Sequence, residues 1–229
     1  MNRIEEFKKQ AAIKAVEQVV SGMVVGLGTG STAKYAVERI GALYQSGELK
    51  DIVGIPSSVQ TEKLALAVGV PLTTFEAHQV IDINIDGADE VDPQLNLIKG
   101  GGGALLREKV IAQASRRNVI IVDESKISDQ LGTRWALPVE VVPFAGPSET
   151  RFLEALGADV SIRKNDDGDF FKTDQNNLIL DADFGPMADP GSLAAQLDNR
   201  AGIAGQGLFI GLTSKVIVAG NDGIRELKP

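Results

Sequence analysis

The chain of 229 residues contains no cysteine. This absence excludes disulfide bonds, thiolate metal sites and cysteine nucleophiles, and it gives no sign of an oxidising compartment. No apolar run is long enough to span a bilayer, and residues 1–16 are charged and helix-periodic, unlike a signal peptide. We therefore expect a cytoplasmic protein without a membrane partner.

Basic residues are also in short supply, because 23 Lys and Arg stand against 31 Asp and Glu, a net charge of -8. A negative chain repels polyanions at long range, so we expect no nucleic-acid partner. A small anion can still bind a local group of amides and lysines. With 43% hydrophobic residues the chain is long enough to bury its own core.

Short apolar runs alternate with segments of helical spacing over the first half of the chain. The expected strands are residues 23–27, 52–55, 80–85 and 118–122, and the expected helices lie within residues 4–19, 33–43, 64–68 and 104–115. This alternation predicts an α/β fold with a Rossmann-like, doubly wound and mainly parallel sheet.

The pattern changes after Leu131, where one helical segment is followed by several strand-like runs. We predict a smaller α+β domain at residues 132–206, with strands in 137–144, 159–164, 169–174 and 177–184. Asn165–Asp169 should form a hairpin turn, because Asp-Gly suits its left-handed geometry. Residues 208–211 and 215–219 return to the buried-strand pattern, so residues 1–131 plus 207–229 should form the Rossmann-like domain.

The first motif, Gly26–Thr32, lies where a predicted strand meets a predicted helix. Glycines let amides approach an anion, and the helix N-terminus adds partial positive charge. The candidate phosphate-binding residues are Thr29, Gly30, Ser31 and Thr32. The run lacks a third fingerprint glycine and a Walker Gly-Lys-Ser/Thr, so NAD and ATP are disfavoured. A turn that only packs a helix on a sheet stays an alternative.

The second motif is Asp86-Gly87-Ala88-Asp89-Glu90, at the carboxyl end of a predicted strand, where α/β sheets bind ligands. Carboxylates three residues apart can converge on one ligand, and their repulsion favours protonation of one, which suits proton transfer between sugar hydroxyls. A solvated acidic turn is the alternative. We expect no metal, since histidine and the calcium-loop spacing are absent.

The third motif is Lys99 followed by four glycines, Gly100–Gly103, that lead into a helix carrying Glu108. Four glycines lose much entropy on folding, which favours a backbone that must approach a ligand over a linker. Lys99 and the amides of Gly100, Gly101 and Gly102 can serve an oxyanion, and Glu108 can act as a base. On its own, Glu108 is better interpreted as a surface glutamate.

The fourth motif is Asp123-Glu124-Ser125-Lys126, again after a strand, so Lys126 is a candidate phosphate ligand. The lone His78 lies in a polar loop and is interpreted as a surface residue. Trp135 and the phenylalanines are interpreted as packing in the core or in the smaller domain.

Together, GLGTGST, DGADE, KGGGG…REK and DESK, in this order and spacing, resemble the A-type ribose-5-phosphate isomerases. The resemblance extends from the first helix to the VIVAGNDG segment near the C-terminus. It implies a metal-free and nucleotide-free enzyme that is a homodimer or homotetramer and interconverts D-ribose 5-phosphate and D-ribulose 5-phosphate. Leu106, where relatives often carry threonine, and the fourth glycine depart from the family pattern.

The resemblance also implies roles for single residues. Residues 29–32 would bind the phosphate end, Asp86–Asp89 and Lys99–Gly102 would line the sugar, Lys126 would contact the substrate, and Glu108 would be the base. An aldose–ketose isomerase moves a proton between C2 and C1 through an enediolate. We expect Asp86 to assist ring opening, Lys99 to stabilise the enediolate and Asp89 to orient hydroxyls.

Two other classes stay open. A sugar-phosphate-binding regulator should carry a DNA-binding module, but one helix precedes the first predicted strand, too little for a helix-turn-helix. An acyl-CoA transferase or an amino-sugar-phosphate deaminase has a similar architecture. The deaminase should place a histidine near the acidic motif, whereas His78 precedes the strand.

Overall fold

A computed structural model describes residues 3–229, which form two compact units. Unit 1 takes in the chain up to Ala88 together with residues 107–126 and 212–229, and unit 2 consists of residues 89–106 and 127–211. The predicted division at 132–206 differs, because residues 89–106 form short strands that pair within unit 2. No helix in residues 3–229 combines the length and the apolar character needed to cross a bilayer.

Unit 1 contains a six-stranded sheet in the order β13-β12-β6-β3-β1-β2. Its strands are β1 Val24–Leu27, β2 Val53–Pro56, β3 Ile83–Asp86, β6 Asn118–Asp123, β12 Lys215–Gly220 and β13 Gly223–Leu227. All neighbours are parallel except β12 and β13. The predicted α/β fold, mainly parallel with a second, smaller domain, is confirmed.

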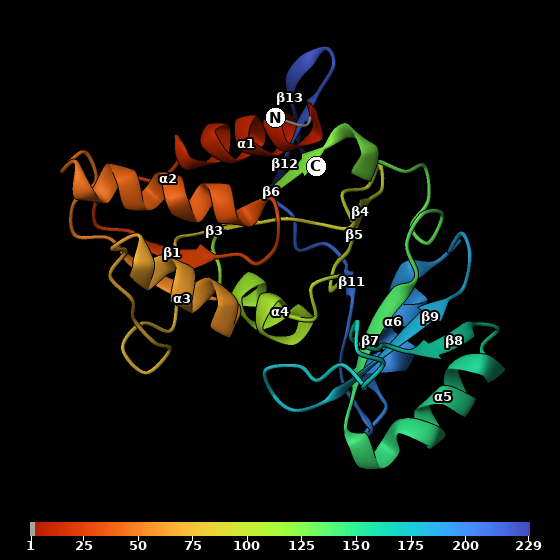
Figure 1. Cartoon of the computed structure of the whole chain (residues 1–229). Coiled ribbons are helices and arrows are strands. Elements are labelled where there is room, and N and C mark those ends of the chain that lie inside the picture. Colours follow the sequence, from red (N-terminus) through yellow and green to blue (C-terminus); the bar gives the residue numbers. More distant parts are fainter. Residues whose placement is uncertain (1–2) are drawn as a thin grey trace. The chain divides into compact units, whose positions relative to one another are not determined.

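Unit 1 has helices on both faces of its sheet, since successive side chains along β1 point to opposite faces. Its helices are α1 Arg3–Val16, α2 Ala33–Gln45 and α3 Val59–Ala67, together with α4 Leu105–Gln113 from Arg107 onward. Val25 and Leu27 face the core that contains α1 and α2, whereas Val24 faces a cluster with Ile111 of α4. Figure 1 shows α1 and α2 on one side of β1 and α4 on the other.

Unit 2 contains two antiparallel sheets, in the orders β10-β7-β9-β8 and β11-β5-β4. Their strands are β4 Glu90–Val91, β5 Leu97–Ile98, β7 Leu137–Val141, β8 Asp159–Ile162, β9 Leu178–Asp183, β10 Ile203–Gln206 and β11 Leu208–Phe209. The helices α5 Gly146–Ala155 and α6 Pro190–Asp198 complete the unit. One apolar core includes residues of both sheets, such as Ile98 and Val139.

Several local predictions for this half of the chain have clear outcomes. The turn at Asn165–Asp169 is confirmed, since the Asn165 amide donates to the Asp169 carbonyl at 2.8 Å and Gly168 has φ +91°. Residues 169–174 were wrongly predicted as a strand and form a single bridge, Lys164 to Phe170. Residues 208–209 pair with β5 rather than with the large sheet, whereas residues 215–219 join that sheet as predicted.

The aromatic side chains do not all pack in a core. Phe209 is fully buried, but Phe144 is 97% exposed, Phe170 is 50% exposed and Trp135 is 37% exposed. The prediction of packing in the core or in the smaller domain is therefore wrong for Phe144, whereas Phe170 and Trp135 are partly covered at the surface. A folded surface retains much apolar area, so aromatic character alone does not decide burial.

Candidate active site

The segment between β1 and α2 has the geometry of an anion-binding loop. Thr29 is half-buried, while Gly30 and Ser31 are exposed. The first turn of α2 carries no acidic side chain, and the N-cap Thr32 does not use its hydroxyl to cap the helix. The helix N-terminus therefore keeps its partial positive charge beside exposed donors.

A cluster of hydroxyl groups supports this loop. The Thr29 Oγ1 atom lies 2.7 Å from Ser57 Oγ, donates to Ser58 Oγ at 2.8 Å and lies 3.0 Å from Thr61 Oγ1. Thr61 Oγ1 in turn donates to the Gly28 carbonyl at 2.9 Å. The Thr29 hydroxyl is therefore part of the loop's own support. Sequence reasoning missed Ser57, Ser58 and Thr61, because they lie 28 to 32 residues from Thr29 and no local pattern places them beside it.

Asp86 connects the first motif to the second. It ends β3, is 1% exposed, and its Oδ1 accepts hydrogen bonds from the Thr29 amide at 3.1 Å and the Gly87 amide at 2.7 Å. The strands approach closely here, since a Cβ on Gly28 would lie 2.6 Å from the Cα of Asp86. Two amides thus hold the Asp86 carboxyl group in a fixed orientation at the carboxyl end of the sheet.

Glu108 belongs to the first turn of α4 and is 5% exposed. Ile111, one turn further on, packs against β1, where a Cβ on Gly26 would meet its Cγ2 at 2.8 Å. A crossover helix begins at the carboxyl edge of a parallel sheet, which is the edge that carries Asp86. The alternative of an ordinary surface glutamate is therefore wrong, because Glu108 is a buried carboxyl group.

Lys126 closes a short 3₁₀ turn, Glu124–Lys126, directly after β6. The Asp123 Oδ1 atom accepts a hydrogen bond from the Ser125 amide at 3.0 Å, and Glu124 accepts one from the Asn221 amide at 3.1 Å. These bonds hold the turn that carries the partly exposed Lys126 at the end of β6 in unit 1.

Unit 2 holds Asp89 and Lys99 on one small sheet. The Asp89 amide donates to the Ile98 carbonyl at 2.8 Å, and the Asp89 Oδ2 atom accepts from the Gly101 amide at 2.7 Å. Lys99 follows β5 and is 3% exposed, and its Nζ lies 5.5 Å from the ring centroid of Phe209. The aromatic face stabilises a cation in this buried position. Sequence reasoning missed Phe209, for which the sequence offers only an aromatic residue in a strand-like run.

The glycine segment is a compact turn rather than a linker. The Gly103 amide donates to the Gly100 carbonyl at 2.9 Å. Gly103 has φ +79°, and a Cβ there would lie 2.5 Å from Cε1 of Phe171. The fourth glycine is thus required by both the backbone conformation and the adjacent ring. Leu106, the other departure, packs against Gly205, where a Cβ would lie 3.2 Å from its Cδ1.

The family model described as "Ribose 5-phosphate isomerase A (phosphoriboisomerase A)" matches residues 53–223. The chain belongs to the ribose 5-phosphate isomerase A family. A ribose-5-phosphate isomerase A of Desulfatibacillum aliphaticivorans is 65% identical over 228 residues, covering 100% of this chain and 99% of that protein. One of Chloroflexus aurantiacus is 56% identical, covering 97% and 93%.

Solved structures of other family members are similar along the whole chain. A D-ribose-5-phosphate isomerase in complex with phospho-erythronic acid has a TM-score of 0.97 and 38% identity, covering 100% of both chains. The ribose 5-phosphate isomerase of Plasmodium falciparum has a TM-score of 0.95 and 42% identity, covering 98% of this chain and 99% of that chain.

The predicted site residues of this family member fall into two groups. Unit 1 holds residues 29–32, Asp86–Ala88, Glu108 and Lys126, and unit 2 holds Asp89 and Lys99–Gly102. The chain passes between the units inside the second motif, after Ala88, and again between Leu106 and Arg107. His78 lies outside both groups as predicted, exposed and with Nδ1 2.9 Å from Thr73 Oγ1.

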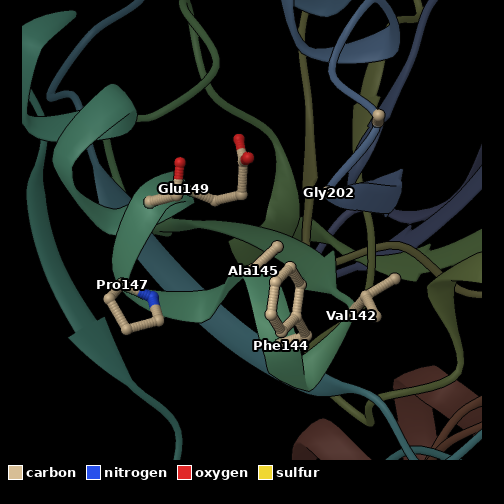
Figure 2. A pocket seen from close by; sticks show the side chains of 8 residues that line it. Val142, Phe144, Ala145, Pro147, Glu149 and Gly202 are labelled. Carbon is tan, nitrogen blue, oxygen red and sulfur yellow. The ribbon is translucent and has the colours of Figure 1, made fainter.

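A hollow of about 550 Å³ in unit 2 lies apart from the predicted residues. Figure 2 shows its lining, in which Val142, Phe144 and Ala145 contribute apolar side chains. Glu149, also in the lining, accepts two hydrogen bonds from Arg200, at 2.9 and 3.0 Å, and its carboxylate raises the pKa of that guanidinium. The residues that line this hollow include no acid–base pair of the kind expected of an isomerase.

Proposed function

We propose that this chain interconverts D-ribose 5-phosphate and D-ribulose 5-phosphate through an enediolate. Membership of the family makes it an aldose–ketose isomerase, and the reaction belongs to the non-oxidative pentose phosphate pathway. The observation that carries the residue assignment is the Asp86 carboxyl group, held by the Thr29 amide of a loop suited to phosphate. A sugar phosphate is the ligand class that needs both a loop that binds phosphate and a carboxyl group that transfers protons.

Glu108 is our candidate for the base that removes the C2 proton and returns it to C1. Its support is its position, because it is a buried carboxyl group in the first turn of α4. Asp86 would move the proton that opens the furanose ring. Lys99, a buried cation, would stabilise the negative charge of the enediolate, and Asp89 would orient sugar hydroxyls.

The phosphate-binding assignment rests on the loop between β1 and α2, in which Gly30 and Ser31 are exposed. Thr29, Gly30, Ser31 and Thr32 would hold the phosphate, with Lys126 adding positive charge. Residues 86–89 and 99–102 would line the sugar. Phospho-erythronic acid, bound in a related isomerase, supports this chemistry, because its carboxylate carries a negative charge over two oxygens as an enediolate does.

We further propose that the enzyme works in the cytoplasm, without a metal or nucleotide, as a homodimer or homotetramer. The absence of cysteine supports the location, and the motif resemblance supports the other two points. Light scattering of the purified protein measures the oligomer directly, and a monomer at enzyme-assay concentrations would overturn that part.

The experiment is the conversion of ribose 5-phosphate to ribulose 5-phosphate by protein dialysed against a chelator. Glu108→Gln should lower kcat by about 10²- to 10⁴-fold and leave binding largely intact. Glu154→Gln, on the exposed face of α5, is the matched control and should keep full activity. Turnover that survives in Glu108→Gln removes the residue from the role of base. Binding of the sugar phosphate without turnover in the wild type would instead indicate a regulator.

A further inference from the structure

The Arg163 side chain joins the four-stranded sheet of unit 2 to the glycine segment after Lys99. Its Nη1 donates to the Gly100 carbonyl at 2.8 Å and to the Gly101 carbonyl at 3.1 Å. Its Nε donates to Asp181 Oδ2 at 2.9 Å, and its Nη2 donates to Asp181 Oδ1. The guanidinium is mostly buried, with 15% of the side chain exposed.

The planarity of the peptide bond gives these contacts a directional consequence. Within a trans peptide the carbonyl and the following N–H point in opposite directions. Arg163 binds the carbonyls of Gly100 and Gly101, so the amides of Gly101 and Gly102 must point away from it. The Gly101 amide does so, donating to Asp89 Oδ2 at 2.7 Å.

We infer that Arg163 is a positioning residue for the isomerisation, acting through the glycine segment. This inference rests on the proposed function. Arg163 orients two successive peptide dipoles, and thereby fixes Asp89 and the backbone that follows Lys99. Asp181 holds the guanidinium in the plane that allows one nitrogen to bind both carbonyls.

Phe171 supports the same arrangement from a second direction. The Arg163 Cζ atom lies 5.9 Å from the Phe171 ring centroid, and this ring packs against Gly103. The guanidinium is therefore held by a carboxylate and an aromatic face while it binds the two carbonyls. Lysine provides the charge without the planar fork, so it cannot reproduce all of these contacts.

The test compares Arg163→Lys and Asp181→Asn with a matched control, Arg200→Lys. Arg200 also makes a two-nitrogen pair with a carboxylate, that of Glu149, and lies over the Phe152 ring, but it makes none of the described contacts to the glycines. Arg163→Lys should lower kcat by about 10- to 100-fold with KM nearly unchanged, because the displaced groups act mainly on the enediolate. Asp181→Asn should change kcat in the same direction, through Arg163, and Arg200→Lys should leave kcat unchanged.

Two binding probes and one structural probe complete the test. Affinity for phospho-erythronic acid should fall in parallel with kcat in Arg163→Lys, while affinity for inorganic phosphate stays constant. Amide exchange at residues 101 and 102 should accelerate in this variant and not in Arg200→Lys.

Equal kcat values in Arg163→Lys and Arg200→Lys, or unchanged exchange at the glycines, would overturn the positioning role. A fall in kcat that is fully explained by a smaller fraction of folded protein would also overturn the positioning role. If Arg163→Lys does not fold at all, the kcat of Asp181→Asn decides whether Arg163 has this role. If the wild type catalyses no isomerisation, while amide exchange at residues 101 and 102 is still faster in Arg163→Lys than in the wild type, the proposed function is overturned. The contact between Arg163 and the glycine backbone would then still stand.

Discussion

Replacing Gly28 with alanine would test the close approach of β1 and β3 at the candidate active site. The new Cβ would lie 2.6 Å from the Cα of Asp86, whereas non-bonded carbons pack about 3.5–4.0 Å apart. Both atoms are tied to the main chain, so no side-chain rotation relieves the overlap. The two strands must separate by about 1 Å, and overpacking of this kind costs about 1–3 kcal/mol in the free energy of unfolding.

The same displacement moves the Asp86 carboxyl group away from the Thr29 amide. A shift of about 1 Å in a positioned group lowers a rate by roughly 100-fold, so kcat should fall by that order as stability falls. Urea unfolding and the isomerase assay measure the two effects. Gly191→Ala is the control, because its Cβ would meet only Asp189 Oδ1 at an ordinary 3.6 Å. A Gly28→Ala enzyme with wild-type stability and kcat would refute the steric reasoning.

Three further predictions concern the phosphate, acid stability and the surface. Lys126→Ala should raise KM with little change in kcat, because a charge-assisted contact contributes about 1.5–3 kcal/mol, and an unchanged KM would contradict the assignment. The pKa of Glu5 is lowered from 4.5 to about 2 by hydrogen bonds from Lys8 and Tyr35, so its contribution to stability is present above pH 4.5 and is lost as the pH falls toward 2. The unfolding temperature of Glu5→Gln should therefore depend less on pH over that interval than that of the wild type. Identical pH dependence in the two proteins would argue against the hydrogen bonds of Glu5 with Lys8 and Tyr35. Phe144→Ser should change the free energy of unfolding by no more than about 0.5 kcal/mol, since the ring is 97% exposed, and a larger loss in chemical denaturation would show that the ring is covered in solution.

The large sheet was predictable because its strands are locally encoded. The run at residues 118–122 is buried along its whole length and forms the centre of a parallel sheet, where both faces are covered. The three-stranded sheet β11-β5-β4 was not predictable, because β5 and β11 have two residues each and pair Ile98 with Leu208. Strands this short leave no periodicity to recognise. The helix α6 carries a local start signal, with Asp189 as N-cap and Pro190 as its first residue, although its short length leaves little helical periodicity.

The chemistry of the candidate site was readable to a similar extent. Motifs that act through adjacent residues, such as the loop at 29–32, are visible because the glycines and hydroxyls are consecutive. The supporting hydroxyls of Ser57, Ser58 and Thr61 depend on β2 lying beside β1, which no local pattern states. The burial of Glu108 likewise depends on how α4 packs, and its charged neighbours in the sequence indicated the opposite.

By itself, the sequence determined the class of fold, the order of the four motifs and the chemical groups available for a sugar phosphate. These are properties of short stretches, set by side-chain period, glycine spacing and residue type. Only the tertiary structure decided which carboxyl groups are buried, that the Thr29 amide holds Asp86, and that Arg163 binds the glycine carbonyls from 62 and 63 residues away. Such contacts arise when distant strands pair, so no property of the neighbouring residues records them.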